Sequence, residues 1–171
     1  LALRSPESAA ALNHLLQSQQ APVFMDVNLR PPWWNLSQTT NLLEQAKWVK
    51  VNDAELDILV DGPATLEAKA ERLLERYDLS WLVVTRGKKG AMSLDSAGNL
   101  LETNPPAETR VVDTVGAGDA FASVCILGLH SDWPYGLIIE RAQRFAAVLV
   151  GSRGATLDDP ELYNALLAEW L

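Results

Sequence analysis

The sequence predicts an α/β fold, with a mostly parallel β-sheet flanked by helices on both faces and an antiparallel hairpin near one edge. Three observations support this prediction. Short apolar runs alternate with segments of helical period, as in strands joined by helices. Two further runs flank a Ser-Ala-Gly turn at residues 96–98, which is typical of a hairpin. Turn residues are regularly spaced and no repeat occurs, so we expect residues 1–171 to form a single partial domain.

The first half of the chain alternates helices with short strands. Ser5 as N-cap and Pro6 at the first helical position predict a helix over Glu7–Gln20. Apolar runs predict buried strands at Val23–Val27, Trp48–Val51 and Trp81–Thr85. The segments between these runs predict helices at Leu36–Ala46, Asp53–Leu59 and Pro63–Tyr77.

The pattern changes after the third strand. Gly90–Thr103 predicts the hairpin, and Thr109–Val112 predicts a further strand. Gly118–Leu129 is apolar nearly all round, so we expect this helix deep in the core. The last two helices are expected at Tyr135–Val150 and Asp158–Leu171. The opening Leu-Ala-Leu has the character of a strand end, so we expect the chain to be the later part of a longer protein.

Composition limits the partners. With 14 basic and 22 acidic residues the net charge is −8, which argues against nucleic-acid and membrane-surface binding. No apolar stretch reaches the length of about 18 residues that a membrane helix needs. The first residues lack the basic and apolar regions of a signal peptide. The single cysteine, Cys125, fits a reducing compartment, and we expect a cytoplasmic protein.

The stretch Val111–Phe121, VVDTVGAGDAF, places small residues between two acids and in front of an apolar helix. Glycines let the backbone approach a ligand closely, and the first amides of a helix attract anions. Gly116, Ala117 and Gly118 are therefore candidates for holding negative charge. Asp119 then stands beside that anion, where a carboxylate can accept a proton from a hydroxyl that attacks a phosphate.

An ordinary structural interpretation stays open for this turn. Asp119 can be an N-terminal helix acid, and the glycines can serve tight packing alone. For an isolated Gly-Ala-Gly-Asp this interpretation is the better one. The generic phosphate motifs do not decide the matter. GxxxxGKS/T is absent, and Phe121 stands where GxGxxG needs its last glycine.

Five segments, in order, resemble the ribokinase-like (PfkB) carbohydrate kinases. DTVGAGDAF at residues 113–121 is similar to their second signature, DTxGAGD, at all seven positions. DVNLRPPWW at residues 26–34 resembles the D-x-N-x-R-x-x-x-W segment of fructokinase-like members. VNDAE, VVTRGKKGA and GSRGA resemble the N-x-x-E, V-T-x-G-x-x-G-A and C-terminal small-residue segments. The chain is identified as the C-terminal part of a fructokinase-like member, with a ribokinase-like fold.

The resemblance implies a role for each matched residue. Asp119 is the base for the sugar hydroxyl, and Gly116, Ala117 and Gly118 form the anion hole for the γ-phosphoryl group. Asn52 and Glu55 help to hold Mg²⁺ and its water near the phosphates. The residues expected around the ATP are Thr85, Gly87, Gly90, Arg30, Ala147 and Gly151. Those expected around a monovalent cation such as K⁺ are Asp113, Val115, Ser152 and Gly154.

Taken alone, some of these residues have other interpretations. Asn52 and Glu55 can be the cap and the first-turn acid of a short helix, and on their own that is the favoured interpretation. Arg30 can pair with a phosphate or with a surface acid. Asp26 can be a structural hydrogen-bonding group only.

The activity that the resemblance implies is ATP-dependent phosphorylation of a hydroxyl on a small sugar or sugar acid. DVNLRPPWW favours fructose or 2-keto-3-deoxygluconate types. The resemblance also implies an absent N-terminal half, which carries the lid, most sugar contacts and often the dimer interface. We therefore expect an open sheet edge beside Val23–Val27, and a chain that is inactive alone or completed by another chain. A homodimer is expected for the complete protein.

Other functions stay open. Nucleoside and hydroxymethylpyrimidine kinases share the fold. A non-catalytic nucleotide-binding remnant would also keep it: the intact Asp119 argues against decay of the site, whereas the missing half argues for it. A dinucleotide-dependent oxidoreductase is disfavoured, because the GxGxxG context is absent.

Overall fold

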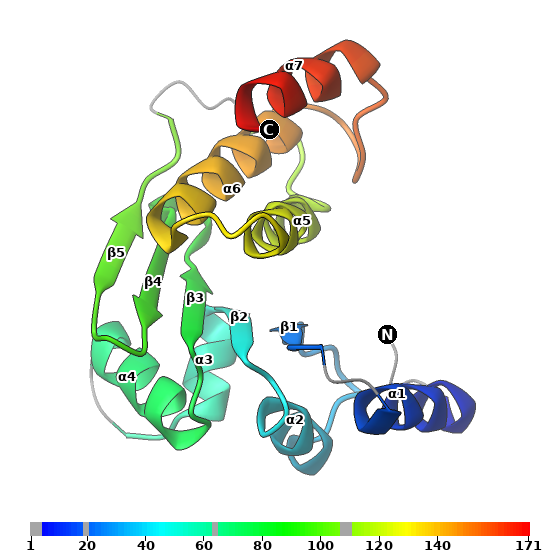
Figure 1. The fold of residues 1–171 in the computed structure, drawn as a ribbon, viewed down its shortest axis with the longest axis vertical. Helices are drawn as coiled ribbons and strands as arrows, with labels where there is room; N and C mark the ends of the chain where they lie inside the picture. The colour runs from blue at the N-terminus through cyan, green and yellow to red at the C-terminus, as the bar shows by residue number, and fades with distance from the viewer. Residues whose placement is uncertain (1–4, 19–20, 63–64, 107–110) are drawn as a thin grey trace. The chain divides into compact units, whose positions relative to one another are not determined.

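The computed structural model describes residues 5–18, 21–62, 65–106 and 111–171 (Figure 1). The chain divides into two compact units, Leu1–Asn104 and Pro105–Leu171. The first unit contains the β-sheet, and the second contains the last three helices. This division does not test whether the chain is a single partial domain, so that expectation stays a prediction.

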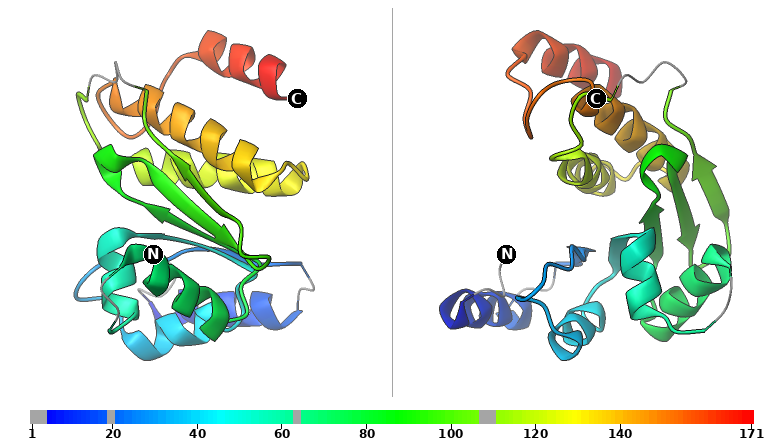
Figure 2. Two further views of the ribbon diagram at one scale, coloured as in Figure 1. Left: turned by 90° about the vertical axis from the view of Figure 1, so that its left-hand side faces the viewer. Right: turned by 180° about the vertical axis from the view of Figure 1, so that it is seen from behind.

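The first unit is built on a mixed sheet of five strands in the order β1-β2-β3-β4-β5. The strands β1, β2 and β3 run parallel to one another, whereas β4 and β5 form an antiparallel hairpin at one edge. Figure 2 shows this hairpin beside β3. The arrangement confirms the predicted α/β class and the edge hairpin. The bounds of the strands are Phe24–Asp26, Trp48–Asn52, Trp81–Thr85, Ala91–Asp95 and Leu100–Thr103.

Side-chain caps begin the helices of this unit. The Asn35 side chain accepts the Gln38 N–H at 2.9 Å, and the Thr65 hydroxyl accepts the Ala68 N–H at 3.2 Å. Such caps satisfy amides that have no partner inside the helix. The helices are α1, α2, α3 and α4, with bounds Pro6–Ser18, Leu36–Leu43, Asp53–Leu59 and Leu66–Arg76.

The core of the first unit lies between the sheet and helices α3 and α4. Alternate residues of β2 and β3, such as Val51 and Leu82, are fully buried and form one apolar cluster with Leu56 and Leu73. Three of the intervening positions, which a strand turns to the opposite face, are also buried, namely Lys50, Trp81 and Val83. A strand buried on both faces explains why these runs are nearly continuous in apolar residues.

Two features close the hairpin and the turn before it. The Asp95 carboxylate accepts the amides of Ala97 and Asn99 at 3.0 and 2.9 Å, which fixes the turn between β4 and β5. Gly90 has φ +78°, and a Cβ there would lie 1.9 Å from the Thr103 carbonyl oxygen. This position therefore requires glycine.

The second unit consists of α5, α6 and α7, with bounds Ala117–His130, Tyr135–Val150 and Pro160–Trp170. Helices α5 and α6 lie side by side (Figure 2), and Gly128 permits their close approach, since a Cβ there would meet Ile138 at 2.6 Å. Helix α7 is attached to α6 by the Arg144–Glu169 ion pair, whose bonds are 2.5 and 3.0 Å long. None of the helices in the described ranges combines the length and apolar character that a membrane crossing requires.

Several predictions about elements need correction. Val111 and Val112 do not form a strand and are exposed, while residues 109–110 lie outside the described part of the chain. Helix α5 is not buried all round, because Ile126 is 54% exposed. Apolar content alone does not place a residue inside, since folded surfaces carry much apolar area. The predicted strand end at residues 1–3 and the predicted helix ends at residues 19–20 and 63–64 also lie outside the described residues.

Candidate functional site

The three parallel strands bring polar residues to one edge of the sheet. Strands β1, β2 and β3 end at Asp26, Asn52 and Thr85. In the pairing register, Asn52 lies opposite Thr85, and Asp26 lies opposite Lys50. The carboxyl ends of parallel strands are the edge at which open α/β sheets bind ligands.

Asn52 and Glu55 form a reciprocal cap at the start of α3. The Asn52 side chain accepts the Glu55 N–H at 2.8 Å, and the Glu55 carboxylate accepts the Asn52 N–H at 2.9 Å. This capping box satisfies two amides at once. The structure thus shows the structural role that the sequence left open for this pair.

The second oxygen of Glu55 has a distant partner. Its Oε1 accepts the Leu29 N–H at 2.9 Å, which joins α3 to the loop after β1. Glu55 is only 7% exposed, so both of its oxygens hold backbone amides in a buried place. Sequence reasoning missed this bond, because nothing in N-x-x-E indicates a partner 26 residues away.

The fit of Mg²⁺ to this pair is limited by these bonds. Each carboxylate oxygen has a second lone pair, so Glu55 retains the capacity to accept a hydrogen bond from a water on the ion. Mg²⁺ often keeps several waters and takes few protein ligands beside phosphates. Among the described residues, no group of three or more His, Cys, Asp or Glu side chains gathers into a metal cage. Asn52 and Glu55 therefore fit an indirect contact with Mg²⁺, made through the waters of the ion.

A buried ion pair lies at the same edge. The Lys50 ammonium donates to both Asp26 oxygens at 3.0 and 3.1 Å. The side chains are 6% and 24% exposed. Sequence reasoning gave Lys50 no role. The signal was a lysine inside the apolar run Trp-Val-Lys-Val-Asn. A lysine is seldom buried unless it is paired with an acid, so this position indicated a buried ion pair.

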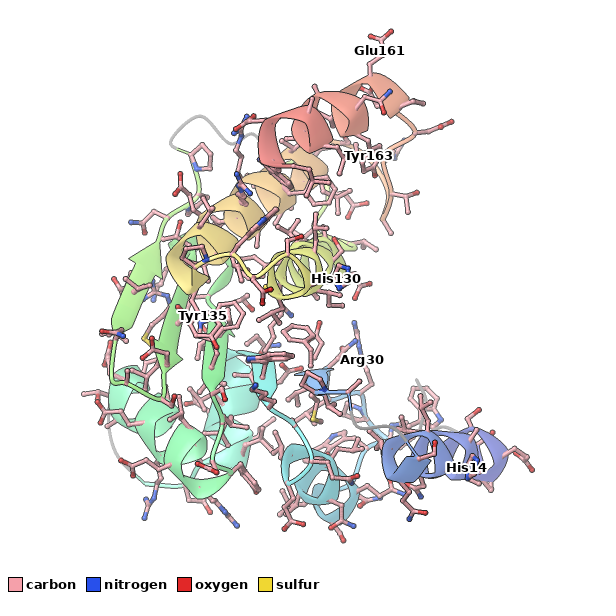
Figure 3. The ribbon with its side chains drawn as sticks, viewed as in Figure 1. His14, Arg30, His130, Tyr135, Glu161 and Tyr163 are labelled. Carbon is pink, nitrogen blue, oxygen red and sulfur yellow. The ribbon has the colours of Figure 1, made fainter. Side chains whose placement is uncertain are left out.

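Arg30 extends from the loop after β1 (Figure 3). Its Nε donates to the Asn28 Oδ1 at 2.9 Å, and Asn28 has the left-handed φ of +45°. Asparagine tolerates this conformation better than most residues. Arg30 is exposed, and no acid within the described ranges forms a salt bridge with it. The alternative of a surface acid as its partner therefore finds no support here.

The loop after β3 places the other predicted nucleotide residues. The Thr85 hydroxyl donates to the Val51 carbonyl at 3.3 Å, and Gly87 has φ +55° at the start of the short 3₁₀ helix Gly87–Lys89. The Gly90 carbonyl accepts the Arg86 N–H at 2.7 Å. Arg86 pairs with Glu102 of β5 at 2.8 Å, which fixes the loop against the hairpin.

Two hollows in the described part of the first unit are lined by residues other than the predicted site residues. One measures about 420 Å³ between α2, α3 and α4, and is lined by residues that include Leu36, Ile58, Arg72 and Tyr77. The other measures about 390 Å³ and is polar, with Asp53, Asp57, Lys69, Arg86 and Lys89 in its wall. The site residues of this unit therefore lie along the sheet edge and outside both hollows.

In the second unit, Gly116 caps α5 in a left-handed conformation with φ +82°. A Cβ at this position would lie 2.6 Å from the Ala155 carbonyl oxygen and 2.8 Å from the Ala155 Cα. Both facts require glycine. The turn before α5 therefore packs directly on the chain after α6.

The first amides of α5 differ in their partners. The Ala117 N–H donates to the Thr114 carbonyl at 3.3 Å, and the Ala120 N–H donates to the Gly116 carbonyl at 2.8 Å. Within residues 111–171, no carbonyl accepts the N–H of Gly118 or Asp119. Both residues are exposed. Two amides at the positive end of a helix are thus available to an anion beside an exposed carboxylate.

Asp113 joins the two loops at this end of the unit. Its Oδ1 accepts the Val115 N–H at 3.0 Å, and its Oδ2 accepts the Gly154 N–H at 3.2 Å. These backbone bonds, first that of Val115 and then that of Gly154, lower the pKa of Asp113 below its ordinary value. The amides of Val112 and Asp113 both donate to the Val150 carbonyl, so the two loops are joined along their length.

The residues predicted for a monovalent cation meet in these loops. The bond from Gly154 to Asp113 brings residues 152–154 against residues 113–115. Within residues 111–171, no backbone amide donates to the carbonyls of Val115, Ser152 or Gly154. Carbonyl and carboxylate oxygens suit hard cations. Ala147 and Gly151, predicted to flank adenine, lie at the C-terminal end of α6, next to the same loop.

Comparison with known proteins gives a family match over most of the chain. A family model described as pfkB family carbohydrate kinase matches residues 2–162. The bifunctional protein HldE of Hahella chejuensis is 32% identical over 174 residues, which cover 98% of this chain and 34% of that protein. The 5-dehydro-2-deoxygluconokinase of Geobacillus kaustophilus is 26% identical over 148 residues, covering 82% of this chain and 44% of that protein. The chain thus spans less than half the length of these curated relatives.

Solved structures share the fold. A candidate ribokinase II of E. coli, in complex with ATP and Mg²⁺, aligns with a TM-score of 0.78 at 20% identity, covering 90% of this chain and 51% of that one. A fructokinase double mutant of Vibrio cholerae O395, bound to fructose, ADP and potassium, aligns with a TM-score of 0.78 at 24% identity, covering 98% and 57%. The predicted ribokinase-like fold is therefore confirmed, over about half the length of these structures.

Proposed function

Since the chain belongs to the pfkB family of carbohydrate kinases, we propose that it supplies the nucleotide side and the catalytic base of an ATP-dependent sugar kinase. The observation that carries this proposal is the start of α5. There, the free amides of Gly118 and Asp119 stand next to the exposed Asp119 carboxylate. An anion hole and a base on adjacent residues are what phosphoryl transfer to an alcohol requires.

The anion hole takes the transferring γ-phosphoryl group. Gly116 supplies the left-handed turn, and the turn Gly116, Ala117 and Gly118 presents amides to the phosphate. The Ala117 amide is partly engaged by Thr114 at 3.3 Å, so the Gly118 amide is the stronger donor of the turn. The Asp119 amide adds a second donor. Transition-state charge on the phosphoryl oxygens is stabilised by such fixed dipoles.

Asp119 acts as the base. A carboxylate in the first turn of α5 lies beside the bound phosphoryl group, where the attacking hydroxyl must also lie for an in-line reaction. The proton moves from the sugar hydroxyl to the Asp119 carboxylate as the hydroxyl oxygen bonds to the γ-phosphorus, and the bond from that phosphorus to the bridging oxygen breaks to release ADP. Positioning and charge stabilisation supply most of the catalysis in phosphoryl transfer.

The remaining site residues hold the nucleotide. Thr85, Gly87 and Gly90 shape the loop along the phosphates, and Arg30 binds a phosphate oxygen with its guanidinium group. Ala147 and Gly151 flank the adenine. Asn52 and Glu55 accept hydrogen bonds from the waters of Mg²⁺, which when bound neutralises phosphate charge. The ATP and Mg²⁺ bound in the related E. coli structure support the choice of these two ligands.

The joined loops of the second unit hold a monovalent cation. Asp113 and the carbonyls of Val115, Ser152 and Gly154 supply oxygen ligands of the kind that K⁺ takes. Potassium in the related fructokinase structure supports this choice. A cation bound here would fix the turn that presents the anion hole, because the chain after α6 packs on Gly116 through Ala155.

The substrate is a small sugar or sugar acid. A sugar substrate is supported by the related fructokinase, which is bound to fructose. A sugar-acid substrate is supported by the name of another relative, 5-dehydro-2-deoxygluconokinase. The fructokinase-like segment DVNLRPPWW supports the same range. A homodimer and a cytoplasmic location remain predictions.

A coupled assay of ADP release tests the proposal. The full gene product that contains residues 1–171 is assayed with ATP and Mg²⁺ against a panel of fructose, other ketoses, aldoses and keto-deoxy sugar acids. We expect release that depends on one sugar class, with no turnover by the 171-residue chain alone. A full gene product that binds ATP but phosphorylates no member of the panel would contradict the sugar-kinase proposal. Turnover by the isolated 171-residue chain would contradict the proposal that activity requires residues beyond this chain.

A further inference from the structure

We infer that Glu55 is a positioning residue for Arg30: its carboxylate fixes the loop after β1, so that the Arg30 guanidinium is presented to an anion at the carboxyl edge of the sheet. This role differs from the water-mediated contact with Mg²⁺ proposed above. It rests on the proposed function in one respect, namely that the anion is a phosphate group of the nucleotide.

The first step is the connection made by Glu55. One of its oxygens accepts the Asn52 N–H and the other accepts the Leu29 N–H, each at 2.9 Å. Asn52 ends β2 and Glu55 lies in the first turn of α3. A single buried carboxylate therefore joins the end of β2, the start of α3 and the loop after β1.

The second step is the position of Leu29 in the loop. The chain up to Val27 is fixed to β2, because the Val27 N–H donates to the Lys50 carbonyl at 3.0 Å and Lys50 pairs with Asp26. Beyond Val27 the chain leaves the sheet. The bond from the Leu29 N–H to Glu55 therefore holds the loop on the residue between Asn28 and Arg30, and the Leu29 side chain packs on the core.

The third step is the orientation of Arg30. Its Nε donates to Asn28 Oδ1 at 2.9 Å, which fixes the plane of the guanidinium group. Asn28 and Arg30 flank Leu29, so the amide that Glu55 holds lies at the centre of this arrangement. The two terminal nitrogens form no salt bridge with an acid in the described ranges. A planar guanidinium with both terminal nitrogens available suits bidentate binding of a phosphate.

The chemistry of the connection calls for a carboxylate. Both of its oxygens accept hydrogen bonds, whereas a glutamine has one accepting oxygen and one donating nitrogen. In Glu55→Gln the side-chain oxygen can keep the capping-box bond to the Asn52 N–H, because glutamine also serves at this position. The NH₂ group then faces the Leu29 N–H, and this buried donor loses its acceptor. Aspartate is shorter by one methylene, so it cannot span the same two amides without movement of the loop.

The test uses three variants of the chain and one phosphate probe. The variants are Glu55→Gln, Arg30→Ala and their double mutant, with Asp57→Asn as the matched control. Asp57 is an exposed acid on the same helix, and it pairs with Lys69. The probe is tripolyphosphate, whose binding requires neither adenine, nor sugar, nor turnover. Amide hydrogen exchange at Leu29 reports the Glu55 bond directly.

We expect Glu55→Gln to speed exchange at Leu29 by about tenfold, the loss of one hydrogen bond. We expect both single variants to weaken tripolyphosphate binding by about tenfold, and the double mutant to bind no worse than Arg30→Ala. Asp57→Asn should match the wild type in exchange and binding. The tripolyphosphate measurements are made without Mg²⁺, so a loss of binding in Glu55→Gln cannot come from a lost contact with the waters of the ion.

A further variant separates positioning from a loss of fold. Asn28→Gly keeps the left-handed backbone but removes the acceptor of Arg30 Nε. It should weaken tripolyphosphate binding while Leu29 keeps its protection. Unchanged exchange at Leu29 in Glu55→Gln would overturn the inference. Additive losses in the double mutant, or a wild type that binds no tripolyphosphate, would each overturn it too. Absence of sugar-dependent ADP release with these binding results intact would contradict the proposed function alone.

Discussion

The Asp113 carboxylate accepts the Gly154 amide at 3.2 Å, and this bond joins the turn before α5 to the loop after α6. The same carboxylate accepts the Val115 amide at 3.0 Å. A single side chain therefore shapes the turn that leads into Gly116 and also holds the neighbouring loop beside it. The proposed anion hole and the proposed cation site depend on the same residue.

The ionisation of Asp113 should be visible in solution. Its backbone hydrogen bonds lower its pKa in the folded chain, so its contribution to stability is complete above the unfolded value, which is about 3.9 for aspartate. That contribution is lost as the pH falls through the lower folded pKa. A carbon-detected NMR titration should show a midpoint for Asp113 below the ordinary aspartate range. In Asp113→Asn this part of the pH dependence of the unfolding free energy should disappear, and a normal midpoint for Asp113 would contradict the observed geometry.

Replacing Gly116 by alanine should destabilise the second unit. The residue needs φ +82° and its Cβ would lie 2.6 Å from the Ala155 carbonyl oxygen. Gly98→Ala is the matched control, since Gly98 has φ +84° with open space around its Cβ position. Both variants lose about 1–2 kcal/mol from backbone strain, and Gly116→Ala should lose at least about 1 kcal/mol more from the clash. Urea denaturation of both chains measures the difference. Equal losses would show that the contact with Ala155 does not constrain the turn.

Removing Lys50 should cost more than removing an exposed partner. Lys50→Met removes the ammonium group that pairs with Asp26, at a site where the two side chains are 6% and 24% exposed. We expect a loss of about 2–3 kcal/mol in unfolding free energy. Lys69→Met breaks a pair whose acid, Asp57, is 61% exposed, and should cost at most about 1 kcal/mol. If chemical denaturation gives the two variants the same midpoint, the buried pair does not stabilise the sheet edge.

The sequence predicted the elements that are bounded by strong local signals. Helix α3 begins at Asp53 after its Asn52 cap and ends at Leu59, as predicted, because the capping box is a local pattern. Strand β3 and helix α6 also keep their predicted bounds. The strand predicted at Thr109–Val112 is wrong in its described half, because β-branched residues favour strands only where a neighbouring strand is available.

The candidate site was predictable as a set of residues, and its internal bonds were not. Motif spacing named Asn52, Glu55 and Arg30 separately. The bond from Leu29 to Glu55 depends on the register of β1 against β2, which no local pattern states. The pairing of Lys50 with Asp26 has the same origin, since parallel strands bring those residues opposite each other. Contacts between segments distant in the chain follow from the folded sheet, and sequence periodicity does not give them.

The central claim is that Asp119 is the base of a kinase, and one substitution tests it most directly. Asp119→Asn keeps the size of the side chain and removes its ability to accept the proton. In the full gene product we expect turnover with the preferred sugar to fall by about 10²–10⁴-fold, while the dissociation constant for ATP stays unchanged. Asp132→Asn, at the other end of α5, is the matched control and should retain full turnover. Wild-type turnover in Asp119→Asn would contradict the account.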